Sequence, residues 1–333
     1  MKPAITLLAL CISACAGSTA EPHAAPTGPS LPTAGPAVVG DSCALARPDF
    51  GGVATAADRA LFAYDVDAPL NLQKTVESTT NGVELSAITF GSPDGGSVTG
   101  VLLDPVERSS LRPGIVLMHG MPGSARVMVG HARALAEHGA VVIAIDAPFA
   151  RRGGSPVRYG TADRTEQIQL IKDLQRALDV LRTRPNVDAA RIAYLGFSYG
   201  GTMGVQFVGI ERRLKAAVLV VADGGLVSHE TGPGDVMLAG LPCATRVAWL
   251  RAMTPIEPIR FIPHASPTPL LLQNGRTDNL VPAADAEALH EAAPQPKTIR
   301  WYDAGHALDH QALVDRHEWL NGQIGLDLLR PPG

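Results

Sequence analysis

RIAYLGFSYGGTMG, residues 191–204, is the stretch that decides the fold. An apolar run, typical of a strand buried on both faces, leads into a Gly-x-Ser-x-Gly cluster and then into small residues that are compatible with a helix. A sharp turn from strand to helix exposes the residue at its apex, and glycines two before and two after it avoid collisions there. We therefore expect Ser198 at that apex, between Gly196 and Gly200.

The segments around this turn alternate between strands and helices. Residues 83–105 alternate apolar and polar side chains on both sides of Asp94-Gly95-Gly96, which predicts an antiparallel β-hairpin. Short apolar runs then predict buried strands at 114–120, 141–148, 191–197, 216–223, 269–275 and 298–305, with helices between them, among them 125–138, 165–181 and 283–292. This order predicts an α/β fold with a mostly parallel, doubly wound sheet and an N-terminal antiparallel hairpin.

One interval is longer than a single crossover helix requires. Residues 224–262 lie between two predicted strands and contain scattered apolar residues. We expect a small helical cap insertion over the carboxyl edge of the sheet, where functional groups gather in such folds. The alternative is a surface excursion that is unrelated to any site.

The composition is that of a globular protein and limits the classes of partner. The chain has 333 residues and a net charge of −4, without a block of Lys or Arg, so we expect no nucleic-acid binding. The ten histidines are scattered, without HExxH, CxxC or clustered carboxylates, so we expect no metal and no cofactor. Two adjacent arginines, Arg151 and Arg152, are expected to face solvent, the alternative being recognition of an acidic substrate group. The sequence does not indicate an oligomeric state.

The N-terminus has the features of an export signal. Residues 1–20 contain one lysine, then an apolar stretch and then small residues. The apolar stretch is too short to span a bilayer, because that requires ~20 apolar residues. Within them, the sequence ISAC resembles a lipobox, in which cleavage before Cys15 leaves a lipidated cysteine; cleavage after Ala20 would instead release a secreted protein. Residues 21–40, rich in Pro, Ala and Gly, predict a linker before a domain at 41–333. We therefore expect a cell-envelope lipoprotein, in the outer membrane or periplasm, or a secreted protein.

Two cysteines lie beyond the predicted signal, Cys43 and Cys243. In an exported protein an even pair predicts a disulfide bond, which would tie the N-terminal arm to a late segment. The alternative is two free, buried thiols.

Three predicted strand ends carry the residue types that activate a serine. A serine hydroxyl is a weak nucleophile, so it needs a base within hydrogen-bonding reach and a group that orients the base. Asp278 follows the predicted strand at 269–275, and His306 follows the last predicted strand. The chain order Ser, Asp, His is that of hydrolases with a nucleophile elbow. We expect Ser198, Asp278 and His306 to form a catalytic triad.

The triad assignments have rivals. His310 lies four residues beyond His306 and could share a helix face with it. Asp223 ends a predicted strand and could supply the acid. Asp303 is expected to be a local turn residue, and Asp146 to have a role in loop structure.

The sequence HGMPGS, residues 119–124, follows a predicted strand at the place where these hydrolases supply an oxyanion donor. We expect the backbone N–H groups of Met121 and Tyr199 to form an oxyanion hole. His119 is expected to brace this loop and not to act as a second base.

Together these segments resemble the α/β-hydrolase family over about residues 83–322. The resemblance is strongest to exported bacterial hydrolases of the dienelactone-hydrolase and acetyl-xylan-esterase-like group, with further likeness to the catalytic domain of prolyl oligopeptidases. SPDGGSVTGVLLDP, GIVLMHGMPGS, GFSYGG, LLLQNGRTDNLVP and YDAGHAL carry it. The resemblance implies that Ser198 is the nucleophile, His306 the general base and acid, and Asp278 its orienting carboxylate. Dienelactone hydrolases proper have cysteine where this chain has Ser198.

The sequence therefore predicts an exported serine hydrolase that cleaves carboxylic esters, with short acyl chains, through an acyl-serine intermediate. An amidase or small peptidase of the prolyl-oligopeptidase type is the alternative, because the triad does not distinguish amides from esters. A lipoprotein that uses the fold only for binding is a third hypothesis.

Overall fold

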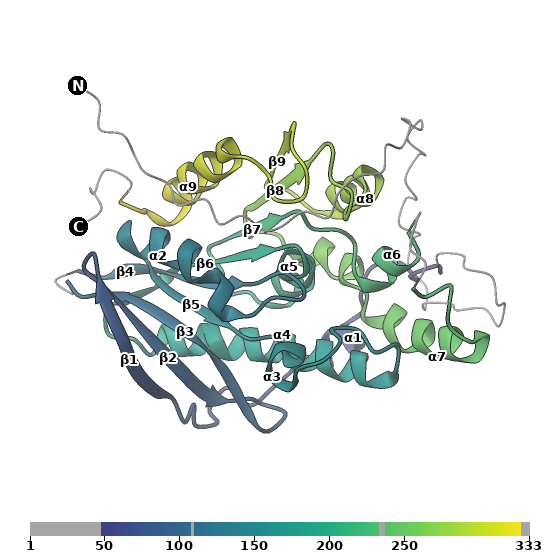
Figure 1. The fold of residues 1–333 in the computed structure, drawn as a ribbon, viewed down its shortest axis with the longest axis horizontal. Coiled ribbons are helices and arrows are strands. Elements are labelled where there is room, and N and C mark those ends of the chain that lie inside the picture. Colours follow the sequence, from purple (N-terminus) through teal and green to yellow (C-terminus); the bar gives the residue numbers. More distant parts are fainter. Residues whose placement is uncertain (1–47, 108–109, 233–236, 328–333) are drawn as a thin grey trace.

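The computed structural model describes residues 48–107, 110–232 and 237–327, which form one sheet of nine strands in the order β1-β2-β3-β5-β4-β6-β7-β8-β9 (Figure 1). Strands β1, β2 and β3 pair antiparallel, as do β3 and β5, and the remaining pairs are parallel. The prediction of a mostly parallel sheet with an N-terminal antiparallel hairpin is confirmed. The strands are β1 (Gln73–Thr80), β2 (Val83–Gly91), β3 (Ser97–Pro105), β4 (Arg112–Met118), β5 (Val141–Ile145), β6 (Val187–Phe197), β7 (Ala216–Val220), β8 (Leu270–Gly275) and β9 (Lys297–Tyr302).

Helices cover both faces of this sheet (Figure 1). Side chains of a strand alternate between its two faces, so Tyr194 of β6 enters one apolar core and its neighbour Leu195 enters the other. The helices on the Leu195 side are α2 (Val129–Glu137) and α9 (His310–Ile324), and those on the Tyr194 side include α4 (Thr161–Arg182), α5 (Tyr199–Ile210) and α8 (Ala283–Ala292). The helices on the two faces bury β4, β5 and β7 completely and so hold the carboxyl ends of the parallel strands in place.

The described part of the interval between β7 and β8 contains short helices and 3-10 turns. It holds α6 (Leu226–Glu230), α7 (Cys243–Met253) and the 3-10 turns η2 (Thr254–Ile256), η3 (Pro258–Arg260) and η4 (Ile262–His264). Helix α7 packs on α4, where the buried Trp249 donates its indole N–H to Asp163 at 2.8 Å. Turns η3 and η4 pack on α5 instead. The later part of the interval therefore packs on a helix. That residues 224–262 form a cap over the carboxyl edge of the sheet stays a prediction.

Three short elements were not expected from the sequence pattern. Helix α1 (Ala56–Ala60) precedes the sheet, α3 (Pro148–Arg152) follows β5, and β1 adds an edge strand. Most side chains of β1 are exposed and polar, so this strand lacks the apolar alternation by which strands are detected. Between β4 and α2, the predicted helix begins with a 3-10 turn, η1 (Ala125–Met128).

The predicted signal at 1–20, the linker at 21–40, Cys15 and Cys43 lie outside the described residues. Cys243, the first residue of α7, is disulfide-bonded. Its pairing with Cys43 stays a prediction. Within the described ranges, no helix has both the length and the hydropathy needed to cross a membrane.

Candidate active site

Ser198 stands at the turn between β6 and α5 in a strained backbone conformation. Its φ is 52° and its ψ is −119°, a combination that residues other than glycine rarely adopt. The Ser198 N–H donates to the Val220 carbonyl of the neighbouring strand β7 at 2.9 Å. The buried Tyr194 hydroxyl donates to the Gly200 carbonyl at 2.5 Å on the other side of the turn. These two bonds hold the strained residue in place.

The two glycines of the turn are required by close backbone contacts. A Cβ atom on Gly196 would lie 2.2 Å from the Gly200 carbonyl oxygen, and one on Gly200 would lie 2.5 Å from the Met118 carbonyl oxygen. Both distances are far below van der Waals contact, so no larger residue fits without moving the backbone. The Gly-x-Ser-x-Gly pattern thus has the physical basis expected from the sequence.

The structure brings together the three residues predicted for the triad. Nε2 of His306 lies 2.9 Å from Oγ of Ser198, and Nδ1 of His306 lies 2.8 Å from Oδ2 of Asp278. The three side chains come from the ends of β6, β8 and β9, which lie near one another at the carboxyl edge of the sheet. This arrangement can move a proton from the serine hydroxyl to the imidazole.

Asp278 is held as a carboxylate by its hydrogen bonds. Burial by itself raises the pKa of Asp278, but the bond from His306 and the backbone N–H groups of Val281 and Leu280 outweigh burial and lower this pKa below its ordinary value. An ionised Asp278 accepts the proton on Nδ1 of His306, which leaves Nε2 free to accept the proton of Ser198. The local bonding thus selects the tautomer that a general base needs.

Asp223, the rival acid, is bonded elsewhere. Its Oδ1 accepts hydrogen bonds from the Thr202 hydroxyl at 2.9 Å and the Gly225 N–H at 3.1 Å, and its Oδ2 lies 3.0 Å from Nδ1 of His229. It therefore belongs to a separate buried group at the end of β7 and does not orient His306.

The other candidates also lie outside the triad. His310 is exposed at the first turn of α9, and Asp303 is exposed and faces Arg276 at 3.3 Å. Asp146 accepts the Ala125 N–H at 2.7 Å, which fits its predicted role in loop structure. Within the described parts of the chain, no group of three or more His, Cys, Asp or Glu residues could hold a metal ion.

His119 braces the loop after β4 with both ring nitrogens. Its Nδ1 donates to the Gly120 carbonyl at 2.7 Å, and its Nε2 accepts the Ala147 N–H at 3.1 Å. Burial lowers the pKa of His119, so the ring is neutral and keeps this bonding pattern near neutral pH. The prediction that His119 supports the loop agrees with this geometry.

Gly120 places this loop against the nucleophile. A Cβ atom on Gly120 would lie 3.2 Å from Cβ and 3.8 Å from Oγ of Ser198. The next residue, Met121, is one predicted oxyanion donor; the other, Tyr199, is the first residue of α5, where N–H groups have no acceptor within the helix. The role of Gly120 was not predicted from the sequence, although a glycine two residues after a buried strand was the available signal.

The prediction that Arg151 and Arg152 face solvent holds for Arg152, which is exposed, and is wrong for Arg151, which is largely buried. The Arg151 guanidinium pairs with the buried carboxylate of Asp173 at 2.7 Å, and Arg152 pairs with Glu166 at 2.7 Å. Both acids belong to α4, so helix α3 turns the arginines back onto its neighbour. Paired in this way, they offer no free cation to an acidic substrate.

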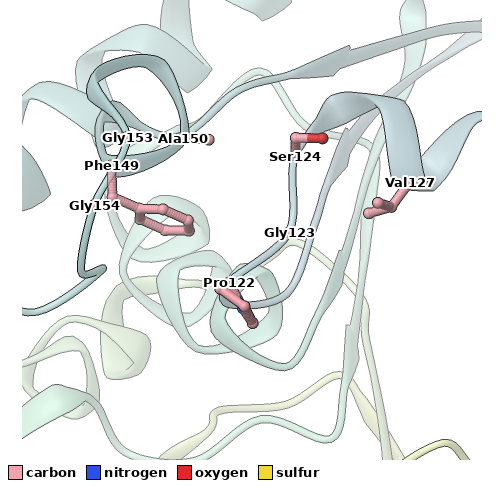
Figure 2. A pocket seen from close by; sticks show the side chains of 8 residues that line it. All are labelled: Pro122, Gly123, Ser124, Val127, Phe149, Ala150, Gly153 and Gly154. Atoms are coloured by element: carbon pink, nitrogen blue, oxygen red, sulfur yellow. The ribbon is translucent and has the colours of Figure 1, made fainter. Parts of the chain in front are cut away.

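A hollow of about 360 Å³ lies beside the loop after β4 (Figure 2). That loop contributes Pro122, Gly123 and Ser124 to its wall, and the 3-10 turn η1 contributes Val127. Helix α3 and the glycines that follow it contribute the opposite wall, including Phe149. The sequence did not predict this hollow, because its walls come from two segments that lie far apart along the chain.

Comparison with known proteins places the chain in a family. The model of the dienelactone hydrolase family matches residues 98–313, a range that contains Ser198, Asp278 and His306. The chain belongs to the dienelactone hydrolase family.

A solved structure is similar in fold, and two curated proteins are similar in sequence. The structure of the acetyl xylan esterase from Paenibacillus sp. R4 aligns with a TM-score of 0.66 at 21% identity, covering 80% of this chain and 92% of that one. The uncharacterized protein YfhR of Escherichia coli (strain K12) is 27% identical over 173 residues, 51% of this chain and 52% of YfhR. The uncharacterized peptidase YuxL of Bacillus subtilis (strain 168) is 27% identical over 246 residues, 66% of this chain and 35% of YuxL. The chain thus spans about half the length of YfhR.

Proposed function

We propose that this member of the dienelactone hydrolase family is a serine hydrolase that cleaves carboxylic esters with short acyl chains. The observation that carries the proposal is the continuous hydrogen-bonded chain from Ser198 Oγ to His306 at 2.9 Å and on to Asp278 at 2.8 Å. The strained backbone of Ser198 supports it, because strain in a non-glycine residue persists where function requires that position.

The reaction begins with acylation. Nε2 of His306 takes the proton of Ser198 as Oγ attacks the ester carbonyl carbon. The carbonyl oxygen becomes negative and accepts hydrogen bonds from the N–H groups of Met121 and Tyr199. The C–O bond to the leaving alcohol then breaks, the alcohol oxygen takes the proton from His306, and an acyl-Ser198 ester remains.

Deacylation repeats these steps with water. His306 takes a proton from a water molecule, and the resulting hydroxide attacks the acyl carbon. The bond to Ser198 Oγ breaks, Oγ takes the proton from His306, and the carboxylic acid leaves. The enzyme returns to its starting state without a cofactor.

The second candidate is an amidase or small peptidase. Its support is the likeness to YuxL, whose name describes a peptidase, together with a triad that could attack either bond. Matched aminoacyl amides and esters with the same acyl group separate the two candidates through the ratio of their kcat/KM values. A third possibility, a lipoprotein that only binds ligands, has less support, because binding alone would not require an assembled triad.

We also propose that the protein is exported and anchored through a lipid on Cys15. The support is the apolar leader and the ISAC sequence at residues 12–15. The mass of the mature N-terminus, compared between wild type and Cys15→Ser, tests this step. An unmodified N-terminus that begins after Ala20 would instead indicate a secreted enzyme.

The proposed activity is tested with p-nitrophenyl butanoate. Ser198→Ala is expected to reduce hydrolysis to the background of the uncatalysed reaction. Ser78→Ala, in the exposed edge strand β1, is the matched control and should keep the wild-type rate. Undiminished hydrolysis by Ser198→Ala would refute the proposed nucleophile.

A further inference from the structure

The hollow beside the loop after β4 lies next to the proposed oxyanion hole. Pro122 directly follows Met121, one proposed donor, and Phe149 across the hollow packs its ring edge-on against Tyr199, the other, at 5.3 Å between ring centres. In Figure 2 the Phe149 ring projects toward Pro122. The hollow therefore adjoins both segments that carry the proposed donors.

The strand order indicates which half of an ester would enter. In the sheet, β4 and β5 lie on one side of β6, and β8 and β9 lie on the other side. Ser198 follows β6, and the segments after β4 and β5 build the hollow. Asp278 and His306 follow β8 and β9, on the opposite side of β6 from the hollow. The leaving oxygen must face His306 to receive its proton. The acyl group, the other substituent of the carbonyl carbon, then points away from His306 and toward the hollow.

The side chains of the wall indicate the chemistry of that group. None of the lining residues is charged, and the Ser124 hydroxyl is their only polar side-chain group. The adjacent arginines, Arg151 and Arg152, are paired with acids of α4. A carboxylate on the acyl group would therefore gain no counter-charge from the residues that line the hollow.

Some backbone groups of the wall are already hydrogen-bonded. The Gly123 N–H donates to the Gly120 carbonyl at 2.8 Å, and the Gly153 N–H donates to the Phe149 carbonyl at 3.0 Å. The Gly153 carbonyl accepts a bond from Arg152 at 2.7 Å. These three groups are less available to the hydroxyls of a sugar ring, whereas an aliphatic chain needs no such partner.

We propose that this hollow binds the acyl group of the substrate, and that the group is uncharged, apolar and longer than acetyl. The inference rests on the proposed esterase function and specifies the substrate class of the same site. The volume of about 360 Å³ is near the lower end of ligand pockets, which span roughly 300–1,000 Å³, so it suits a compact acyl chain.

The first test is a substrate series with the wild-type enzyme. Values of kcat/KM are measured for p-nitrophenyl acetate, butanoate, hexanoate and hemisuccinate, each corrected for its uncatalysed rate. We expect kcat/KM to rise up to fourfold or so for each added methylene from acetate to hexanoate. The hemisuccinate, whose acyl chain is as long as butanoate but ends in a carboxylate, should fall at least about tenfold below butanoate.

The second test changes the wall at Val127, whose side chain is exposed, so that its replacement does not threaten the fold. Val127→Asp should lower the hexanoate-to-acetate ratio of kcat/KM, and Val127→Lys should raise the ratio of hemisuccinate to butanoate. Val76→Asp and Val76→Lys, in the exposed strand β1, are the matched controls and should leave both ratios at wild-type values.

The outcomes separate this inference from the proposed function. If no ester in the series is hydrolysed, the proposed function fails. If esters are hydrolysed but kcat/KM is flat or falls from acetate to hexanoate, only the acyl-group inference is overturned. A series of acetates of longer alcohols gives a further check: if Val127→Asp changes the alcohol dependence and not the acyl dependence, the hollow binds the alcohol, and the assignment is wrong.

Discussion

Oδ2 of Asp278 lies 2.8 Å from Nδ1 of His306, while Oδ1 of the same carboxylate accepts the N–H groups of Leu280 and Val281. The N–H groups of its own loop thus fix the carboxylate through one oxygen, and the other oxygen orients the imidazole. This relationship makes the tautomer of His306 depend on a single acceptor oxygen.

Asp278→Asn is expected to lower kcat by about 10³ to 10⁴. The amide that replaces the carboxylate carries no negative charge to stabilise the protonated imidazole. If the amide NH₂ group faces His306, the ring takes the tautomer with its proton on Nε2, and Nε2 then cannot accept the proton of Ser198. Steady-state kinetics with p-nitrophenyl butanoate measure the loss, and Asp303→Asn, at an exposed aspartate, is the control. A variant that kept half of the wild-type kcat would assign the orienting role to another residue.

Gly120→Ala is expected to lower kcat about ten- to a hundredfold with little loss of stability. The added methyl group would lie 3.2 Å from Cβ of Ser198 and 3.4 Å from the Phe197 carbonyl oxygen, so the loop must shift and carry the Met121 N–H with it. Gly130→Ala in α2, where a Cβ meets nothing within 4 Å, is the matched control and should keep full activity. Equal activity of the two variants would argue against a catalytic place for the loop.

Glu257 predicts a pH dependence of stability. Its carboxyl group is buried and accepts hydrogen bonds from the N–H groups of Ser228 and Val227. Burial raises the pKa of Glu257 to about 8, and the negative charge of Asp223 contributes to this increase. Between its ordinary pKa of 4.5 and about 8, the folded protein holds a proton that the unfolded chain has lost. The contribution of this group to the free energy of unfolding is therefore complete at low pH and decreases as the pH rises through that window, by at most about 1.4 kcal/mol per pH unit.

Urea unfolding of wild type and Glu257→Gln at about pH 6 and about pH 8 measures this effect. The uncharged glutamine should flatten the decrease, whereas Glu291→Gln, at an exposed position of α8, should retain it. Identical pH dependence in wild type and Glu257→Gln would show that Glu257 does not hold a proton in the folded state.

The disulfide of Cys243 is expected to stabilise the fold. Mapping of peptides without reductant should recover Cys243 joined to Cys43, the pairing expected from the sequence. Reduction, or Cys43→Ser, should lower the free energy of unfolding by roughly 2–4 kcal/mol. Recovery of both residues as alkylatable thiols before reduction would contradict this assignment.

The sequence predicted those features that local patterns encode. The turn around Ser198 needs glycines at Gly196 and Gly200, and the buried strands need apolar runs, so both leave a continuous signal. Asp278 and His306 could be placed because each directly follows such a strand. The parallel sheet then brings the strand ends together at one edge.

The features that the sequence did not predict depend on contacts between distant segments. The partners of Arg151 and Arg152 are Asp173 and Glu166, acids of α4 whose approach depends on how α3 packs. The hollow arises where two loops face each other, and no local pattern encodes its shape. Strand β1 has no apolar face to mark it, since it pairs at the edge of the sheet through backbone bonds.

The identity of the nucleophile is tested most directly by covalent labelling with a fluorophosphonate, followed by intact mass measurement and peptide mapping. The account predicts one adduct per chain, on Ser198, with esterase activity lost in proportion to labelling. Ser198→Ala should take up no label although it remains folded. An adduct on another residue, or full hydrolysis by completely labelled protein, would contradict the assignment of Ser198 as the nucleophile.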